Sequence, residues 1–171
     1  IEQRLKLAEE SAIPVKTNIE AVKRIIARLP FELTLSQKKS LWEILQELEK
    51  GHPMNRLLQG DVGSGKTIIA AIAATEVAER GHQTAFMAPT EILAHQHYKT
   101  LTKFFPEFEK GIALLTGSES KVFYGRHLET VLKKDLLKKM IAQGKIKITV
   151  GTHALIQKNL SFKDLALVVV D

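Results

Sequence analysis

The sequence has no cysteine, and this absence excludes disulfide bonds and thiolate metal sites. It also has no apolar run near the ~20 residues of a membrane-spanning helix, and it shows no signal-peptide pattern. We therefore expect a protein without membrane contact, and a cytoplasmic location fits the missing cysteine. With 171 residues, of which 44% are hydrophobic, the chain can bury the core of one ordinary domain.

Neither end of the sequence resembles a natural terminus. The chain starts at Ile1 and stops at Asp171, directly after an apolar run. We therefore expect a fragment of a longer protein.

Positive charge is concentrated in one stretch. The net charge is +6, and residues 121–147 alone hold eight Lys or Arg against two acidic residues. This segment predicts a helix whose apolar stripe drifts. Such a cluster can attract nucleic-acid phosphates or can be a solvated helix face, and both interpretations stay open.

Apolar spacing predicts helices first and a β–α alternation afterwards. Residues 1–30 are predicted to be a helical linker segment ended by Pro30, in which SAIPVKTN is a linker between helical parts. A further helix begins after Thr34. Residues 31–171 are predicted to form one α/β domain, with three layers and a mainly parallel sheet. The predicted strands are Leu57-Leu58, 83–88, 111–116, 146–150 and 165–170, with helices over 67–80 and about 90–104.

The strongest motif is a glycine-rich turn that fits the pattern G-x-x-x-x-G-K-[ST]. Glycines let consecutive N–H groups point at one anion, and the helix that follows adds its dipole. Lys66 supplies positive charge for the β- and γ-phosphates, and Thr67 offers a hydroxyl to the Mg²⁺ that offsets triphosphate charge. The turn is therefore predicted to bind a nucleoside triphosphate through Gly60, Asp61, Val62, Gly63, Ser64, Gly65, Lys66 and Thr67.

A second feature is the carboxylate that follows the last apolar strand. Asp171 stands where a Walker B strand carries its aspartate, and it would hold Mg²⁺ through water opposite Thr67. Lys66 and Asp171 are thus the candidate catalytic residues, and Thr67 and Asp171 are the candidate metal ligands. By contrast, His95 and His97 are two apart on a predicted helix and face different directions, so they make a poor metal pair.

Six stretches resemble, in order and spacing, the first motor lobe of the RecG family of bacterial DNA helicases. They lie between residues 29 and 171 and read LPFELTLSQ, PMNRLLQGDVGSGKT, MAPTEILAHQHY, LLTGS, VGTHALIQ and LALVVVD. The resemblance implies a RecA-like lobe that binds ATP and Mg²⁺ in a helicase of superfamily 2. Such helicases remodel stalled forks and Holliday junctions in repair and recombination. The transcription-repair coupling factor is the similar alternative, although a Phe usually stands there at the position of Ser64.

The resemblance also implies adenine contacts by two residues. The ring of Phe31 would lie near adenine, and the amide of Gln37 would read the edge of the base. However, Thr34 and Gln37 also form the pattern of a capping box, S/T-x-x-Q. The two roles compete for one side chain, and the resemblance favours adenine.

Three further motifs would contact DNA. Strand ends followed by helix starts offer N–H groups and hydroxyls to phosphates without reading bases. Ordinary helix capping is the alternative for Thr90 and Thr152, and a packing or hydrogen-bonding role is the alternative for His153. The implied contacts are Thr90, Glu91, Thr116, Gly117, Thr152 and His153.

The parent protein is expected to couple ATP hydrolysis to movement along branched or duplex DNA. Its partners within the same chain would be a second RecA-like lobe, which supplies arginines, and a wedge domain. The fragment alone is expected to bind nucleotide weakly and to separate no strands of DNA.

Two other classes of nucleotide-binding protein fit less well. A small-molecule kinase would need lid arginines, of which only Arg126 lies in a plausible region. A guanine-nucleotide switch would need the base-binding motif N/T-K-x-D, which the sequence lacks. A non-catalytic binding module derived from a motor also stays open.

Overall fold

The computed structural model describes residues 11–171, which divide into two compact units. The first, here called the helical unit, ends at Arg80, and the second, the sheet unit, spans Gly81–Asp171. The first ten residues of the helical segment predicted over 1–30 lie outside the described residues. Within residues 11–171, no helix is long and apolar enough to cross a membrane.

The helical unit contains three helices: α2 (Ile19–Ala27), α3 (Leu35–Leu48) and α4 (Lys66–Glu79). Helices α2 and α3 both pack against α4, whose sequence is rich in alanine and whose residues are mostly buried. Asn18 caps α2 and Thr34 caps α3, each accepting a hydrogen bond from a backbone N–H in the first turn. The sequence predicted that one helix begins after Thr34 and another within the glycine-rich turn, and both predictions are confirmed.

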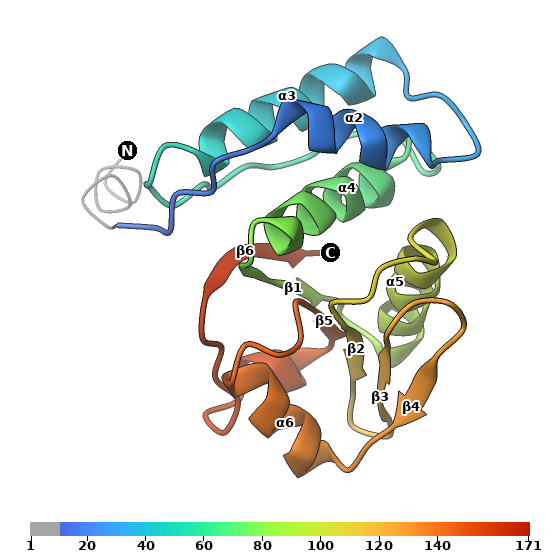
Figure 1. Ribbon diagram of the computed structural model, residues 1–171, viewed down its shortest axis with the longest axis vertical. Helices are drawn as coiled ribbons and strands as arrows, with labels where there is room; N and C mark the ends of the chain where they lie inside the picture. The colour runs from blue at the N-terminus through green and yellow to red at the C-terminus, as the bar shows by residue number, and fades with distance from the viewer. Residues whose placement is uncertain (1–10) are drawn as a thin grey trace. The chain divides into compact units, whose positions relative to one another are not determined.

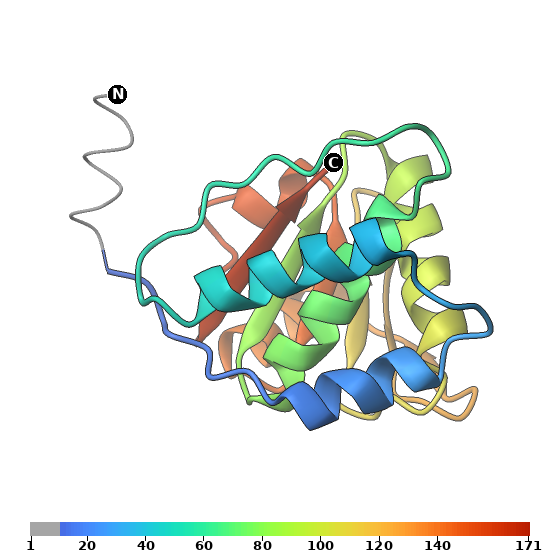
Figure 2. The same cartoon turned by 90° about the horizontal axis from the view of Figure 1, so that it is seen from above.

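The strand predicted at Leu57-Leu58 is wrong. Residues 53–61 are irregular, and Leu57 is 79% exposed. This segment returns alongside α3 from its C-terminal end to the start of α4 (Figure 2). Arg56 forms ion pairs with Glu43 and Glu47 of α3, and these hold the segment beside that helix. A helix offers no free strand edge, so residues 53–61 have no neighbouring strand with which to form sheet hydrogen bonds.

The sheet unit contains a six-stranded sheet of order β4-β3-β2-β5-β1-β6 (Figure 1). Strands β2, β5, β1 and β6 are parallel neighbours, whereas β3 and β4 are added antiparallel at one edge. The prediction of an α/β fold with a mainly parallel sheet is confirmed. The strands are β1 (Gln83–Met87), β2 (Ile112–Leu115), β3 (Ser120–Phe123), β4 (Glu129–Val131), β5 (Ile148–Gly151) and β6 (Leu165–Val170).

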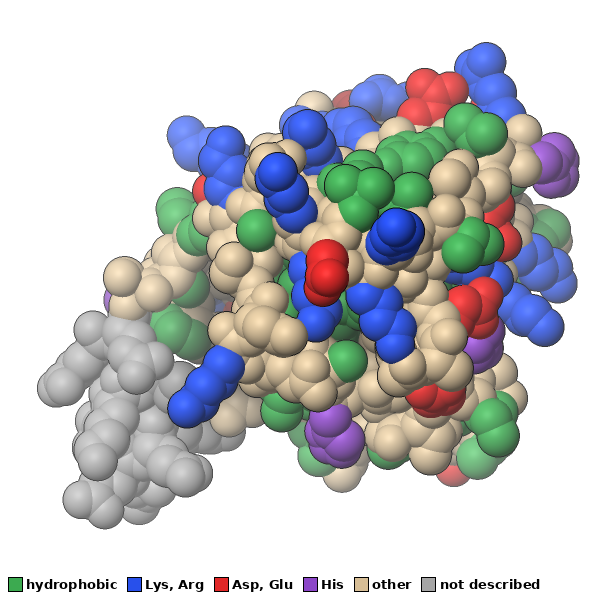
Figure 3. Space-filling model, turned by 90° about the horizontal axis from the view of Figure 1, so that it is seen from below, with side chains coloured by type: hydrophobic (Ala, Val, Ile, Leu, Met, Phe, Trp, Pro, Cys, Tyr) green, Lys and Arg blue, Asp and Glu red, His purple; other side chains and the backbone are tan. Residues whose placement is uncertain are grey.

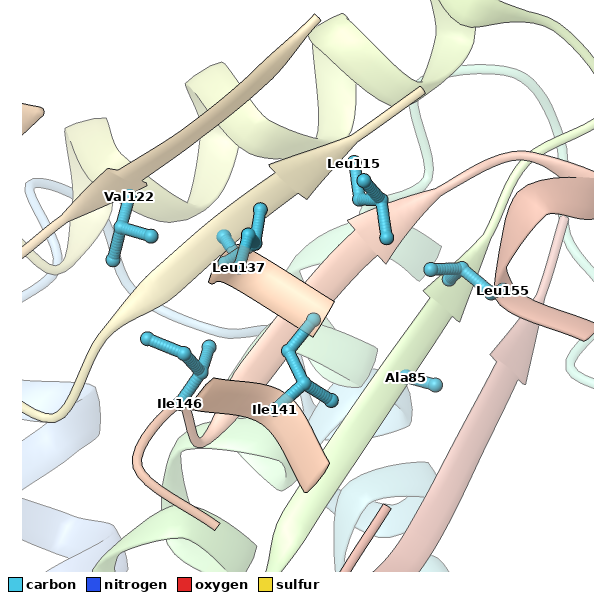
Figure 4. Close-up of a cluster of buried hydrophobic side chains, with 8 residues drawn as sticks. Ala85, Leu115, Val122, Leu137, Ile141, Ile146 and Leu155 are labelled. Carbon is cyan, nitrogen blue, oxygen red and sulfur yellow. The ribbon is translucent and has the colours of Figure 1, made fainter. Parts of the chain in front are cut away.

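Two helices cover opposite faces of this sheet: α5 (Glu91–Phe104) and α6 (Lys134–Ala142). Ala85 of β1 belongs to the apolar cluster that Leu137 and Ile141 of α6 complete (Figure 4). Phe86, the next residue, contacts His97 of α5 instead. Because successive side chains of a strand point to opposite faces, α5 and α6 must lie on different sides, giving three layers within this unit.

Residues 121–131 do not form the helix predicted there. They form most of the β3–β4 hairpin, in which Lys121 pairs with Val131 and Phe123 with Glu129. Arg126 and His127 turn the chain with φ values of 50° and 63°, a conformation in which non-glycine residues are uncommon. Only α6 matches the predicted helix. The loop between β3 and β4 lacks the Asn-Gly pair typical of tight hairpin turns, so no local turn signal marked the hairpin.

Candidate nucleotide-binding and DNA-binding sites

The glycine-rich loop is shaped by backbone angles that side chains disfavour. Gly63 and Gly65 have φ values of 81° and 84°, and Gly65 is the N-cap of α4. The first N–H groups of a helix have no partner within it, so the loop and the start of α4 together present donors to an anion. The ammonium of Lys66 donates to the carbonyl oxygens of Gly60 at 2.7 Å and Asp61 at 2.8 Å. The cation is thus held inside the loop.

Gln37 joins this loop to the start of α3. Its Oε1 accepts from the Thr34 N–H at 2.8 Å, while the Thr34 hydroxyl accepts from the Gln37 N–H at 3.2 Å, which completes the predicted capping box. Its Nε2 donates to the Ser64 carbonyl at 2.8 Å. Gly65 has a φ of 84°, which disfavours any side chain, and a Cβ there would also crowd the flexible Gln37 amide. The capping role is confirmed, and the adenine contact stays a prediction.

Phe31 lines a groove of 510 Å³ in the helical unit. The groove lies between the end of α2 and the start of α3 and also contains Pro30 and Lys38. Its volume falls within the about 300–1,000 Å³ typical of ligand pockets. Phe31 is 41% exposed, and its contact with adenine stays a prediction.

The residues predicted to contact DNA follow strands that end at one edge of the sheet. Strands β2, β5 and β1 are adjacent and parallel, and Gly151 pairs with both Leu115 and Met87. Their carboxyl ends therefore bring together the starts of three motifs, in the spatial order Thr116, Thr152, Thr90. Asp171 follows β6, the neighbour of β1 on the other side, and stands at the same edge. This edge is where open α/β sheets bind ligands.

Glu91 ties two of these motifs together. Its carboxylate accepts hydrogen bonds from the backbone N–H and the hydroxyl of Ser118. The Ser118 hydroxyl is the main reason why the pKa of Glu91 lies below its ordinary value. Thr116 is buried, and its hydroxyl accepts from the Glu119 N–H at 3.1 Å. Gly117 and Ser118 are therefore the exposed part of this turn.

Thr90 and Thr152 differ in whether their side chains cap a helix. Thr90 caps α5, since its hydroxyl accepts from the Leu93 N–H at 3.3 Å. Thr152 precedes the short 3₁₀ helix η1 (His153–Ile156) but makes no side-chain capping bond. His153 is exposed and is not packed in the core. Their DNA contacts stay predictions, and only Thr90 has the local role that sequence reasoning proposed as the alternative.

Asp171 has a partner that the sequence did not indicate. Its Oδ2 lies 2.9 Å from Nε2 of His97, while its backbone N–H donates to the Met87 carbonyl at 2.9 Å. Within residues 11–171, no group of three or more His, Cys, Asp or Glu could form a metal cage. A single carboxylate and a hydroxyl nevertheless suit Mg²⁺, which usually keeps several waters and uses substrate phosphates as ligands. Asp171 and Thr67 carry these two types of oxygen, and their role as Mg²⁺ ligands stays a prediction.

Part of the basic segment is committed to structural contacts. Lys121 forms ion pairs with Glu119 at 2.9 Å and Glu129 at 3.4 Å, and Tyr98 of α5 donates to Glu129 at 2.6 Å. Burial, with this hydrogen bond second, raises the pKa of Tyr98. These contacts dock the hairpin on α5.

Figure 3 shows a face of the molecule on which many Lys and Arg side chains are exposed. Lys133 and Lys139 are exposed on or beside α6, and Lys134 donates to the Gly117 carbonyl. A DNA role for this segment stays a prediction, as does the solvated alternative.

Comparison with known proteins supports the resemblance found in the sequence. The RecG helicases of Aquifex aeolicus and Thermotoga maritima are each 42% identical to the chain, over 99% and 98% of its length. A structure of RecG bound to a three-way DNA junction matches 98% of the chain with a TM-score of 0.85 and 41% identity. The chain spans about a fifth of these proteins, at 20% of each sequence and 22% of the solved chain.

A more distant structure shares the fold alone. The UvsW helicase of bacteriophage T4 matches 84% of this chain and 46% of the UvsW chain, with a TM-score of 0.51 at 15% identity.

A family model described as DEAD/DEAH box helicase matches residues 34–171, which include the glycine-rich loop, the carboxyl ends of the parallel strands and Asp171. This chain therefore belongs to the DEAD/DEAH box helicase family.

Proposed function

We propose that this chain is the ATP-binding lobe of a RecG-type motor that couples ATP hydrolysis to the remodelling of branched DNA. Membership of the helicase family implies ATP binding. The observation that carries the proposal is a complete phosphate-binding loop in a chain 42% identical to RecG helicases over nearly its whole length. Because bacterial DNA lies in the cytoplasm, a motor that acts on it would also be cytoplasmic.

Each part of the nucleotide site would act on a different part of ATP. The loop N–H groups and Lys66 would hold the phosphates, and Phe31 and Gln37 would hold the adenine. Thr67 and Asp171 would hold Mg²⁺, which neutralises charge on the phosphates when bound. Hydrolysis further requires transition-state arginines, which we assign to a second RecA-like lobe of the parent protein.

The edge of the sheet would hold the DNA backbone. Hydroxyls of Thr90 and Thr152, the amide of Gly117 and the side chain of His153 suit contacts to phosphates, which carry no sequence information. A motor that steps along any sequence requires such contacts. Branch recognition would come from a wedge domain elsewhere in the parent protein.

The proposal predicts that branched DNA stimulates ATP hydrolysis by the parent protein. We expect a three-way junction to raise turnover about tenfold over the rate without DNA, in the range usual for coupled sites. Linear duplex of the same base composition serves as the control and should stimulate less. Steady-state hydrolysis measured with each DNA checks this, and equal rates with and without junction DNA would contradict the proposal.

Gln37 offers a test that separates adenine recognition from helix capping. Gln37→Ala is expected to lower ATP affinity about tenfold and to abolish the preference for ATP over GTP, because the base edge loses its hydrogen-bonding partner. Thr34→Ala removes the capping hydroxyl but keeps the Gln37 amide. It should cost about 1 kcal/mol of stability and leave the nucleotide preference unchanged. Competition binding with ATP and GTP measures both variants; an unchanged preference in Gln37→Ala would restrict Gln37 to capping.

A further inference from the structure

Asp171 is held at two points that come from different elements. Its backbone N–H bonds the end of β1 through the Met87 carbonyl, at 2.9 Å. Its side chain, which is 51% exposed, bonds His97 of α5 through Oδ2. The main-chain bond fixes where the residue lies, and the side-chain bond fixes which way its carboxylate is turned.

His97 is itself immobilised. Its side chain is only 11% exposed, and its ring centroid lies 5.9 Å from that of Phe86, which is fully buried in β1. An ionised carboxylate can only accept hydrogen bonds, so Nε2 of His97 must carry the proton in this pair. The imidazole is therefore a fixed donor aimed at one oxygen of Asp171.

This arrangement leaves the two oxygens of Asp171 with different roles. Oδ2 is engaged by His97, so Oδ1 would be the oxygen that accepts from water bound to Mg²⁺. Groups that orient a metal ligand through a hydrogen bond typically contribute a factor of 10–100 to metal affinity or activity. A carboxylate that binds Mg²⁺ through water depends on such orientation, because the ion demands near-ideal octahedral geometry.

We propose that His97 is a positioning residue that orients the Asp171 carboxylate for Mg²⁺ in the ATP-bound motor. This inference rests on the function proposed above, and what it adds is the role of His97. His97 contacts neither nucleotide nor DNA in this role. It acts through Asp171, whose rotamer it holds by one hydrogen bond.

The test uses the full-length parent protein and three substitutions at one position. His97→Leu removes the donor at similar volume, and His97→Asn keeps an amide that is too short to reach Asp171. His97→Gln carries its amide nitrogen close to the place of Nε2 and should restore the bond. His95→Leu is the matched control, because His95 lies on the same helix but pairs with Glu119.

The main measurement is the Mg²⁺ concentration that half-saturates the binding of a fluorescent ATP analogue. We expect His97→Leu and His97→Asn to raise it about tenfold or more, and His97→Gln to return it close to the wild-type value. Nucleotide affinity in the presence of EDTA should not change in any variant. Hydrolysis should show a lower kcat at limiting Mg²⁺, with the KM for ATP unchanged at saturating Mg²⁺.

Different outcomes overturn different claims. A wild-type Mg²⁺ dependence in His97→Asn, or a defect in His97→Gln as large as that in His97→Asn, would overturn the positioning role. A similar defect in His95→Leu would attribute the effect to α5 in general and would also overturn it. His97→Asn and His97→Gln decide the matter if His97→Leu fails to fold. A Lys66→Ala protein that still hydrolyses ATP would instead overturn the proposed function, independently of His97.

Discussion

Replacing Lys66 by Ala is expected to lower ATP turnover by the parent protein by about 10²–10³-fold, the loss typical when one group that stabilises transition-state charge is removed. The ammonium lies within the glycine-rich loop and bonds the carbonyl oxygens of Gly60 and Asp61. Phosphate oxygens would attract it away from these carbonyls. No other cation of the loop can take its place, because Lys66 is the only Lys or Arg between residues 57 and 79.

The control for this variant is Lys50→Ala, which removes the same charge from an exposed position two residues beyond the end of α3. Its turnover should equal that of the wild type. Both substitutions should change the free energy of unfolding by no more than about 0.5 kcal/mol, as is usual away from the core. Steady-state hydrolysis with saturating junction DNA and thermal unfolding together measure the two effects. Full turnover in Lys66→Ala would exclude the loop as the catalytic nucleotide site.

Local signals in the sequence predicted those parts of the fold whose stability is decided locally. The Thr34 capping box, the start of α4 in the glycine-rich turn and the parallel strands all depend on short patterns, and each is confirmed. Strand β2 is buried on both faces and reads as a continuous apolar run, which leaves little ambiguity about its burial. Strands β1 and β5 are also buried, but they include the polar residues Gln83, Thr84 and Thr149.

The predictions of secondary structure were wrong where a local pattern was compatible with two structures. The apolar pair Leu57-Leu58 suits a buried strand, but Arg56 binds two carboxylates of α3 and Leu57 stays exposed. In the hairpin, positive charge suggested a solvated helix, while Val122 and Phe123 are buried parts of β3. The β-branched and aromatic residues of 122–124 and 130–131, on either side of Gly125, were the signal that could have identified the hairpin.

Long-range partners could not be predicted from spacing. His97 and Asp171 are 74 residues apart, and Glu91 and Ser118 are 27 apart. Their contacts exist because β2, β5, β1 and β6 all end at one edge, so that residues following different strands become neighbours. Considering His97 only together with His95 missed its partner, because helical neighbours were the only contacts that the sequence specified.

The same edge predicts a large effect on stability. Gly151→Ala is expected to lower the free energy of unfolding by about 2–4 kcal/mol, through overpacking of a buried site. Gly151 ends the central strand β5 and pairs with strands on both sides. A Cβ there would overlap the backbone carbonyl oxygen of Leu115 and lie 2.9 Å from two carbons of the Leu155 side chain. Backbone on one side and a buried leucine on the other leave the methyl group no space.

Gly117→Ala is the matched control, because Gly117 lies two residues beyond the carboxyl end of β2, the neighbour of β5, and neither glycine needs a positive φ. Its Cβ would meet only Oε1 of Glu91, at 2.8 Å, and a flexible carboxylate can move away. Thermal unfolding followed by circular dichroism should therefore show a melting temperature about 4–16 °C lower for Gly151→Ala and little change for Gly117→Ala. Equal melting temperatures in the two variants would mean that β2 and β5 are not in the register that brings Leu115 beside Gly151. The common edge for Thr116, Thr152 and Thr90 depends on that register, so this measurement of stability also tests the geometry of the proposed DNA contacts.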